Sequence, residues 1–146
     1  MSTTIDASTL KKIQLHLEAM YPHEACGFLL GIQSTGKREI TLHIEADNIF
    51  TENQRRRFVI HSLEYLRSEK AAATNGLELL GIYHSHPDHP AIPSVHDVEY
   101  AQPFFSYFIH SIVGGTMVDT RSYRLLNHRL EEEVIDDGGE PQRRRP

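Results

Sequence analysis

Apolar positions along the chain follow two spacings, one typical of helices and the other typical of strands. Over residues 6–20 they recur every three or four residues, which predicts an amphipathic helix with one face toward the core. Residues 62–73 form a second such segment, for which Ser62 is a candidate N-cap. Residues 94–101 form a third, shorter one that Pro103 ends. The chain therefore holds three candidate helices.

Between and after these segments lie runs that predict strands. Residues 25–32 and 78–83 are nearly continuous apolar runs, as in strands that are buried on both faces. Residues 38–46 alternate after a turn, as in a hairpin. The other candidate strands are short: 58–60, 107–113, 122–127 and 130–135. Mixed helices and strands predict a single α/β domain over residues 1–135, and residues 136–146, which lack core formers, are expected to be a disordered tail.

Composition narrows the class of protein. With 146 residues, 39% of them hydrophobic and 24% charged, the chain fits one globular domain. A net charge of -5 argues against nucleic acid as the main partner. No apolar run approaches the length of a membrane helix, and the first residues lack the basic and apolar regions of a signal peptide. The single Cys26 cannot form an internal disulfide, so we expect a cytoplasmic protein.

The candidate chemistry is concentrated after the second apolar run, where His84 and His86 follow each other at a spacing of two. Side chains at i and i+2 of a strand share a face, so the two imidazoles point to one place. Pro87 and Pro90 are expected to end the strand. The loop then brings Asp97. Two histidines and one carboxylate predict a three-ligand zinc site with a fourth position for water, which is the layout of a catalytic zinc.

The remaining candidates each have a structural explanation on local sequence alone. Ser94 and Asp97 fit the Ser-x-x-Asp pattern that caps a helix. Glu24 stands at the start of the first buried strand, where a carboxylate is normally solvated. Cys26 could be a thiol nucleophile, but a free cysteine in an apolar strand is usually a small buried hydrophobe. The three arginines at 55–57 are either a solvated run or a contact for an acidic partner.

Taken together, these residues resemble a known motif. Glu24 precedes a Cys-Gly-Phe-Leu-Leu-Gly run, and a His-Ser-His-Pro run at 84–87 is followed, six residues later, by Ser-Val-His-Asp at 94–97. This is closely similar to the JAMM motif of the MPN-type zinc metalloproteases, in which Glu is followed by His-x-His-Pro and then by Ser-x-x-Asp. The similarity extends over residues 7–127, and the short chain resembles the compact prokaryotic branch of the family.

The resemblance implies a role for each residue of the motif. His84, His86 and Asp97 would be the zinc ligands. Glu24 would be the general acid/base that takes a proton from the activated water. Ser94 would donate a hydrogen bond to the oxyanion that develops on the substrate, and it can also cap the third helix.

The same resemblance implies a curved mixed β-sheet flanked by helices, the MPN/JAMM fold, which is related to the fold of the cytidine deaminases. A deaminase itself would need His-x-Glu followed by Pro-Cys-x-x-Cys, which a chain with one cysteine cannot supply. His89 and His96 lie within the motif region at positions that the family does not use, so we expect both to be exposed.

The compact branch implies a zinc metallopeptidase or isopeptidase that hydrolyses the bond after the C-terminal Gly-Gly of a ubiquitin-like protein. The expected partner is a ThiS/MoaD-like sulfur carrier or its cysteine adduct. Two alternatives stay open at this point. One is a non-catalytic MPN scaffold module, although such modules have typically lost ligands or the glutamate and this chain has lost none. The other is a zinc hydrolase of a small amide.

Overall fold

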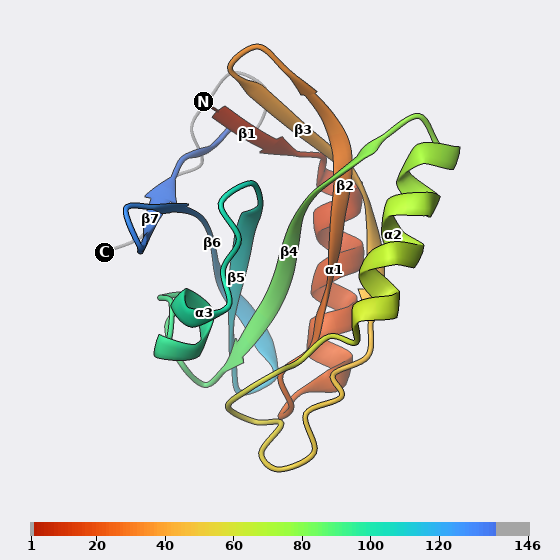
Figure 1. The fold of residues 1–146 in the computed structure, drawn as a ribbon. Helices are drawn as coiled ribbons and strands as arrows, with labels where there is room; N and C mark the ends of the chain where they lie inside the picture. Colours follow the sequence, from red (N-terminus) through yellow and green to blue (C-terminus); the bar gives the residue numbers. More distant parts are fainter. Residues whose placement is uncertain (1, 137–146) are drawn as a thin grey trace.

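The computed structural model describes residues 2–136, which form three helices and one eight-stranded sheet (Figure 1). In chain order the elements are β1 (Ser2–Ile5), α1 (Ala7–Met20), β2 (Cys26–Ser34), β3 (Lys37–Ala46), α2 (Ser62–Thr74), β4 (Glu78–Pro87), α3 (Val95–Glu99), β5 (Ser106–Val113), β6 (Thr116–Leu126), β7 (Arg129–Glu133) and β8 (Ile135–Asp136). The strand order is β7-β6-β5-β4-β2-β3-β1-β8. Pairing is parallel at β4–β5, β1–β3 and β1–β8 and antiparallel elsewhere. The predicted curved mixed sheet with flanking helices is confirmed.

The helices cover opposite faces of the sheet. α1 begins after Asp6, whose side chain accepts a hydrogen bond from the Thr9 N–H, and it buries Ile13 and Leu17 in the core on its face. α2 lies on the other side of β2 and β4 and closes a second core, to which Ala72 belongs (Figure 1). Both faces of the central strands are therefore buried, which explains their nearly continuous apolar sequence.

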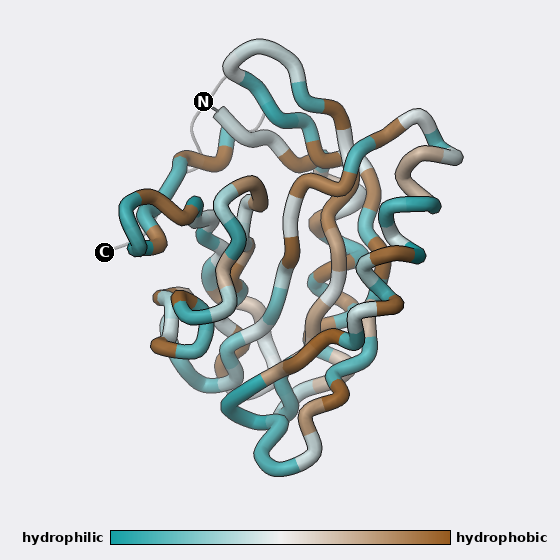
Figure 2. The backbone as a smooth tube through the Cα atoms, viewed as in Figure 1, coloured by the Kyte–Doolittle hydropathy of each residue, from teal (hydrophilic) through white to brown (hydrophobic). Residues whose placement is uncertain are grey.

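Strand β4 carries a bulge that decides which way its histidines point. Leu29 of β2 pairs with Gly81, whereas the next residue, Leu30, pairs with Leu79, so Leu80 is an extra residue in β4. The bulge shifts the alternation and places Leu79 and Ile82 in the core on the α2 side. His84 and His86 follow Ile82 at intervals of two and therefore share the α2 face. Figure 2 shows the strand changing from hydrophobic to hydrophilic toward this end.

The strand that begins with the apolar run at 78–83 extends beyond that run. β4 continues through both histidines to Pro87, because β5 pairs with it in parallel as far as Pro87 and Ile112. The prediction that the strand carries both histidines and ends at the proline after them is therefore confirmed. The residues of β4 after His84 are paired with β5 alone, because β2 begins at Cys26, which lies opposite His84.

Other corrections concern short segments. Residues 58–60 are not a strand but part of a loop, from which Ile60 packs into the core. The N-cap of α2 is His61, whose side chain accepts a hydrogen bond from the Leu63 N–H, and not Ser62. β1 and β8 were not predicted, and Asp136 of β8 pairs with Thr4, so pairing continues one residue into the predicted tail. Residues 137–146 lie outside the described residues.

Within residues 2–136 the longest helix is α1, with 14 residues, and no helix there has the length and apolarity that a bilayer crossing requires.

Candidate active site

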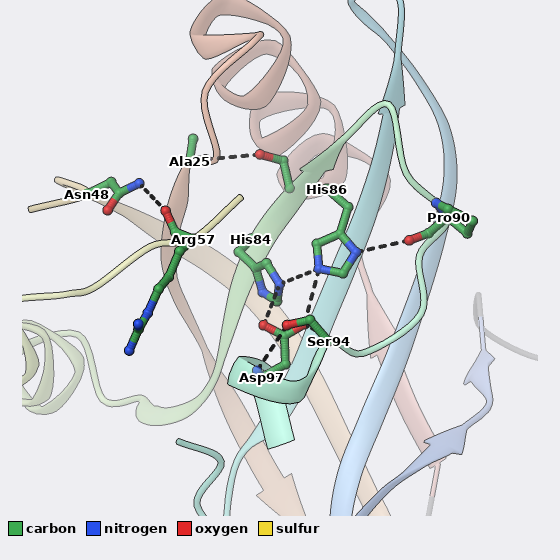
Figure 3. A network of polar contacts seen from close by, with 9 residues as sticks. Ala25, Asn48, Arg57, His84, His86, Pro90, Ser94 and Asp97 are labelled. Atoms are coloured by element: carbon green, nitrogen blue, oxygen red, sulfur yellow. Dashed lines mark hydrogen bonds and ion pairs between the residues drawn. The ribbon is translucent and has the colours of Figure 1, made fainter. Parts of the chain in front are cut away.

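The three predicted zinc ligands converge at the carboxyl end of β4 (Figure 3). The Nε2 atom of His84 lies 3.1 Å from Nε2 of His86 and 3.2 Å from Oδ1 of Asp97. Nε2 of His86 lies 3.1 Å from Oδ2 of Asp97. Ligand atoms of a tetrahedral zinc, each about 2.0–2.1 Å from the ion, lie about 3.3 Å apart. The donor types and their separations therefore fit a single cation.

The surroundings of the two histidines fix their rings. Nδ1 of His86 lies 2.9 Å from the carbonyl oxygen of Pro90, to which it can donate. A hydrogen on Nδ1 leaves the Nε2 lone pair directed at the centre, as in many metal sites. The His84 ring lies against Phe58, with ring centroids 4.5 Å apart. Nδ1 of His84 is buried and has no hydrogen-bond partner within residues 2–136.

Asp97 is placed by the capping box of α3. The Ser94 N–H donates to Oδ2 of Asp97 at 2.8 Å, and the Asp97 N–H donates to Oγ of Ser94 at 3.1 Å. The same Oδ2 atom faces His86, so the capping role and a place at the centre are compatible. Burial alone would raise the pKa of Asp97, but His84, His86 and the Ser94 N–H outweigh it and hold that pKa below its usual range. The carboxylate is therefore ionised.

Glu24 lies just before β2 and is buried, with 5% of the residue exposed. The expectation of a solvated strand-end carboxylate is therefore wrong for this residue. It lines the same cavity as His84 and Asp97. Burial raises the pKa of the Glu24 carboxyl to about 8; His86 opposes this increase and Asp97 adds to it. A carboxyl with such a pKa can both accept and release a proton near neutral pH.

The backbone around Glu24 is held from two sides. Its carbonyl oxygen accepts a hydrogen bond from Nδ2 of Asn48 at 3.1 Å, and its N–H donates to the carbonyl oxygen of Gln54. The N–H of Ala25 donates to Oγ of Ser85 at 2.9 Å, and the Ser85 N–H donates back to the Ala25 carbonyl at 3.0 Å. Since Ser85 stands between His84 and His86, these bonds connect the backbone next to Glu24 to the strand that carries both histidines.

Asn48 organises the loop that covers Glu24. Its Nδ2 also donates to the carbonyl of Arg57 at 3.0 Å, and its Oδ1 accepts from the N–H groups of Phe50 and Val59, both at 3.0 Å. All the polar atoms of this side chain are thus engaged. The sequence analysis did not single out Asn48, because it lies in a polar loop without periodicity and its bond to Glu24 spans 24 residues.

A cavity of about 380 Å³ adjoins His84 and Asp97 on the α2 face. Its apolar part consists mainly of side chains from the sheet and from the loop before α2: Phe58, Ile60, Ile82, Tyr107, Ile109 and Leu130. Its polar part includes Glu24, His84, Ser94 and Asp97, so the cavity brings together every residue of the predicted motif except His86. Such a cavity is large enough for part of a peptide chain.

The structure also shows the burial of the candidate residues that do not belong to the motif. Cys26 is fully buried and pairs with His84 across β2 and β4, and burial raises the pKa of its thiol, as expected for a small hydrophobe and not for a nucleophile. His89 and His96 are exposed, as predicted, and the group of possible ligands does not include them. Of the three arginines, Arg55 and Arg56 are exposed, whereas Arg57 is half-buried.

Comparison with known proteins identifies the family. A model of the prokaryotic homologues of the JAB domain matches residues 6–126, a range that contains every predicted site residue. The chain is 32% identical over 105 residues to a Thermus thermophilus protein named "Probable TtuB-protein conjugate cleaving protease", covering 72% of this chain and 67% of that one. It is 29% identical over 133 residues to the "CysO-cysteine peptidase" of Mycobacterium tuberculosis, covering 90% and 88%.

Solved structures agree on the fold. A protein of Desulfitobacterium hafniense superposes with a TM-score of 0.82 at 28% identity and covers 94% of both chains. A JAB1/MPN domain protein of Archaeoglobus fulgidus superposes with a TM-score of 0.59 at 18% identity, covering 92% of this chain and 97% of that one. With the motif, the fold and the family model in agreement, this chain belongs to the prokaryotic branch of the JAB family, the JAMM/MPN family.

Proposed function

We propose that this protein is a zinc metallopeptidase that hydrolyses the bond after the C-terminal Gly-Gly of a ubiquitin-like sulfur carrier, and that it acts in the cytoplasm. The observation that carries the proposal is the convergence of His84, His86 and Asp97 beside the buried Glu24 in one cavity. Both named relatives are peptidases, one for TtuB-protein conjugates and the other for CysO-cysteine. A scaffold module would have no use for this arrangement.

His84, His86 and Asp97 are the residues that would hold the zinc ion. Bound there, zinc supplies a Lewis acid that activates water and polarises the scissile carbonyl. The contact of His86 Nδ1 with the Pro90 carbonyl keeps the Nε2 lone pair toward the centre. The ionised Asp97 supplies the negative charge that a cation site requires.

Glu24 is the residue that moves the proton. Its carboxylate takes a proton from the attacking water and delivers it to the leaving nitrogen when the peptide bond breaks. A pKa of about 8 suits both halves of this task, because the group gains and loses a proton at small cost near neutral pH. The bonds from Asn48 and Gln54 to its backbone hold it at the cavity wall.

Ser94 is placed to stabilise the charge that develops on the scissile carbonyl oxygen. Its Oγ accepts a hydrogen bond from the Asp97 N–H and donates none within residues 2–136, so its O–H hydrogen is available to a substrate. A neutral donor of this kind stabilises an oxyanion without competing for the metal. A Gly-Gly tail fits such a site because glycine lacks the Cβ that would obstruct a close approach.

Substituting the proposed base tests this function directly. Glu24→Gln is expected to keep the fold and one zinc per chain, but to lower turnover of a CysO-cysteine adduct by about 10²- to 10⁴-fold, because an amide cannot accept the proton. Zinc content by elemental analysis and single-turnover cleavage are the measurements. Near-normal turnover by zinc-loaded Glu24→Gln would contradict the proposed mechanism.

A second candidate, a zinc hydrolase of small amides, is favoured only by the small size of the cavity. Comparing an intact carrier adduct, the same adduct with its terminal glycine changed to valine, and the free tail peptide separates the two. The intact adduct is expected to have by far the highest kcat/KM, because the carrier body contributes binding energy that positions the bond. Equal values for all three substrates would remove the carrier from the proposal.

A further inference from the structure

Arg57 lies in the wall of the site cavity, where its guanidinium contacts two aromatic rings. Its guanidinium carbon is 4.9 Å from the centre of the Phe50 ring and 5.4 Å from the centre of the Tyr100 ring. Its Nη2 donates to the Tyr100 hydroxyl at 3.0 Å. Its backbone carbonyl accepts the bond from Asn48 (Figure 3). The guanidinium therefore bridges the loop before α2 and the end of α3, in the wall of the cavity that His84 and Asp97 also line.

This guanidinium has no carboxylate partner within the described residues 2–136. The carboxylates that line the cavity are Glu24 and Asp97, and both have roles at the metal centre. Its Nε is buried without a hydrogen-bond partner in the same part of the chain. Nη1 and the second hydrogen of Nη2 remain to donate. A half-buried guanidinium with free donors and no counter-ion is well suited to bind an anionic group of a ligand.

The proposed reaction brings one such group into the cavity. Hydrolysis adds a water molecule across the bond after Gly-Gly, so that the carrier leaves with a new carboxylate and the other product leaves as an amine. If that other product is a single amino acid, its α-carboxylate carbon lies only about 2.5 Å from the scissile nitrogen. If it is a protein attached through a lysine side chain, no carboxylate stands at that place.

We infer that Arg57 binds the α-carboxylate of a single amino acid on the leaving side, so that the substrate class is a carrier bearing one C-terminal amino acid. This inference rests on the proposed function and narrows it. The two named relatives differ at this point, since one is named for protein conjugates and the other for a cysteine adduct. Arg57 assigns this chain to the second type of substrate.

The test compares two substrates that differ only in the anionic group. CysO carrying a C-terminal cysteine is compared with the same adduct as its cysteine amide, using zinc-loaded protein. The wild type is expected to cleave the acid at least about 10-fold faster than the amide in kcat/KM, as a charge-assisted hydrogen bond predicts. Arg57→Met, which keeps an unbranched side chain between the two rings, is expected to lower kcat/KM for the acid by about 10- to 100-fold and for the amide by less than about threefold.

The matched control is Arg55→Met, which changes an exposed arginine two residues away that does not line the cavity. It is expected to keep the acid-to-amide ratio of the wild type, and zinc content and unfolding temperature show whether each variant is folded. Equal rates for acid and amide in the wild type would overturn the inference. So would an Arg57→Met protein that retains the ratio or loses both activities equally. A wild type that cleaves neither adduct would contradict the proposed function itself.

Discussion

Two groups of histidines lie on opposite sides of β4, and of these two only one has the geometry of a metal centre. On the face covered by α2, His84, His86 and Asp97 bring their ligand atoms to 3.1–3.2 Å from one another. The side chain of Asp97 is 8% exposed, and the capping box of α3 fixes its orientation. In the described part of the chain, this is the one group of three such side chains whose ligand atoms lie within 4.8 Å of one another.

On the face covered by α1, the neighbouring Tyr83 meets a second cluster. Its hydroxyl lies 2.8 Å from Nδ1 of His16, and its ring contacts the ring of His43. The carboxylate of Glu45 lies 3.8 Å from Nε2 of His16 and 3.7 Å from Nε2 of His43, and its side chain is 57% exposed. This group, like the first, has two histidines and one carboxylate, but its ligand atoms do not converge.

The difference shows that residue type and proximity do not by themselves make a metal site. Asp97 is buried and held by a helix cap, whereas Glu45 is an exposed strand residue with freedom to turn toward solvent. A carboxylate that is fixed in place loses little entropy when a cation binds, and its burial keeps water from competing. The two groups therefore differ in whether the surrounding structure holds the carboxylate in place.

The largest effect is expected from a matched pair of alanine variants, one on each face. His84→Ala is expected to lose bound zinc and to lower turnover by at least about 10³-fold, because two ligands cannot hold the ion in place. His16→Ala is expected to keep one zinc and turnover within about twofold of the wild type. Elemental analysis and cleavage of a carrier adduct check both. Loss of zinc from the His16 variant would show that both clusters bind metal.

A smaller effect is expected from the loop that supports Glu24. Asn48→Ala removes the bond to the Glu24 carbonyl and the three bonds that order the loop, and we expect kcat to fall by about 10- to 100-fold with zinc content unchanged. Asn53→Ala is the control, because Asn53 lies in the same loop and, within residues 2–136, its side chain accepts a hydrogen bond only from the Arg55 N–H. Equal activity of the two variants would show that the loop does not position Glu24.

The stability of the metal-free protein should respond to pH through Glu24. The folded group, with a pKa of about 8, keeps its proton between pH 4.5 and 8, whereas the unfolded group, with a pKa of 4.5, has lost it. Rising pH therefore lowers the free energy of unfolding of the wild type, by at most about 1.4 kcal/mol per pH unit from this group. Glu24→Gln lacks this proton, so its stability relative to the wild type should increase from pH 5 to pH 8. Urea unfolding at both pH values measures this, and a difference that is constant with pH would contradict it.

The smallest effect is expected from a substitution of Cys26, the residue that lies opposite His84. Cys26→Ser is expected to leave zinc content and turnover near those of the wild type, because the buried thiol takes no part in the proposed chemistry. It should cost about 1–2 kcal/mol of stability, since a hydroxyl replaces an apolar contact in the core. Thermal unfolding and turnover check both parts. A folded, zinc-loaded Cys26→Ser protein without turnover would return the thiol to the mechanism.

Part of the site could be predicted from the sequence because it depends on local geometry. The i, i+2 spacing of His84 and His86 aligns them on any strand, and the Ser-x-x-Asp pattern indicates how Ser94 and Asp97 meet. The burial of Glu24 could not be predicted, because it depends on a loop that closes over it through bonds from distant residues. Likewise, β1 and β8 have four and two residues, too few to show periodicity, and they form only through partners elsewhere in the chain.

The most direct test of the central claim is a zinc titration of the metal-free protein with cleavage of a carrier-cysteine adduct as the readout. The claim is that His84, His86 and Asp97 hold the ion on which hydrolysis depends. Activity is expected to be absent after chelation, to rise in proportion to added zinc and to level off at about one equivalent per chain. Full activity in the chelated protein, or activity that is restored by zinc in His84→Ala as well as in the wild type, would contradict the claim.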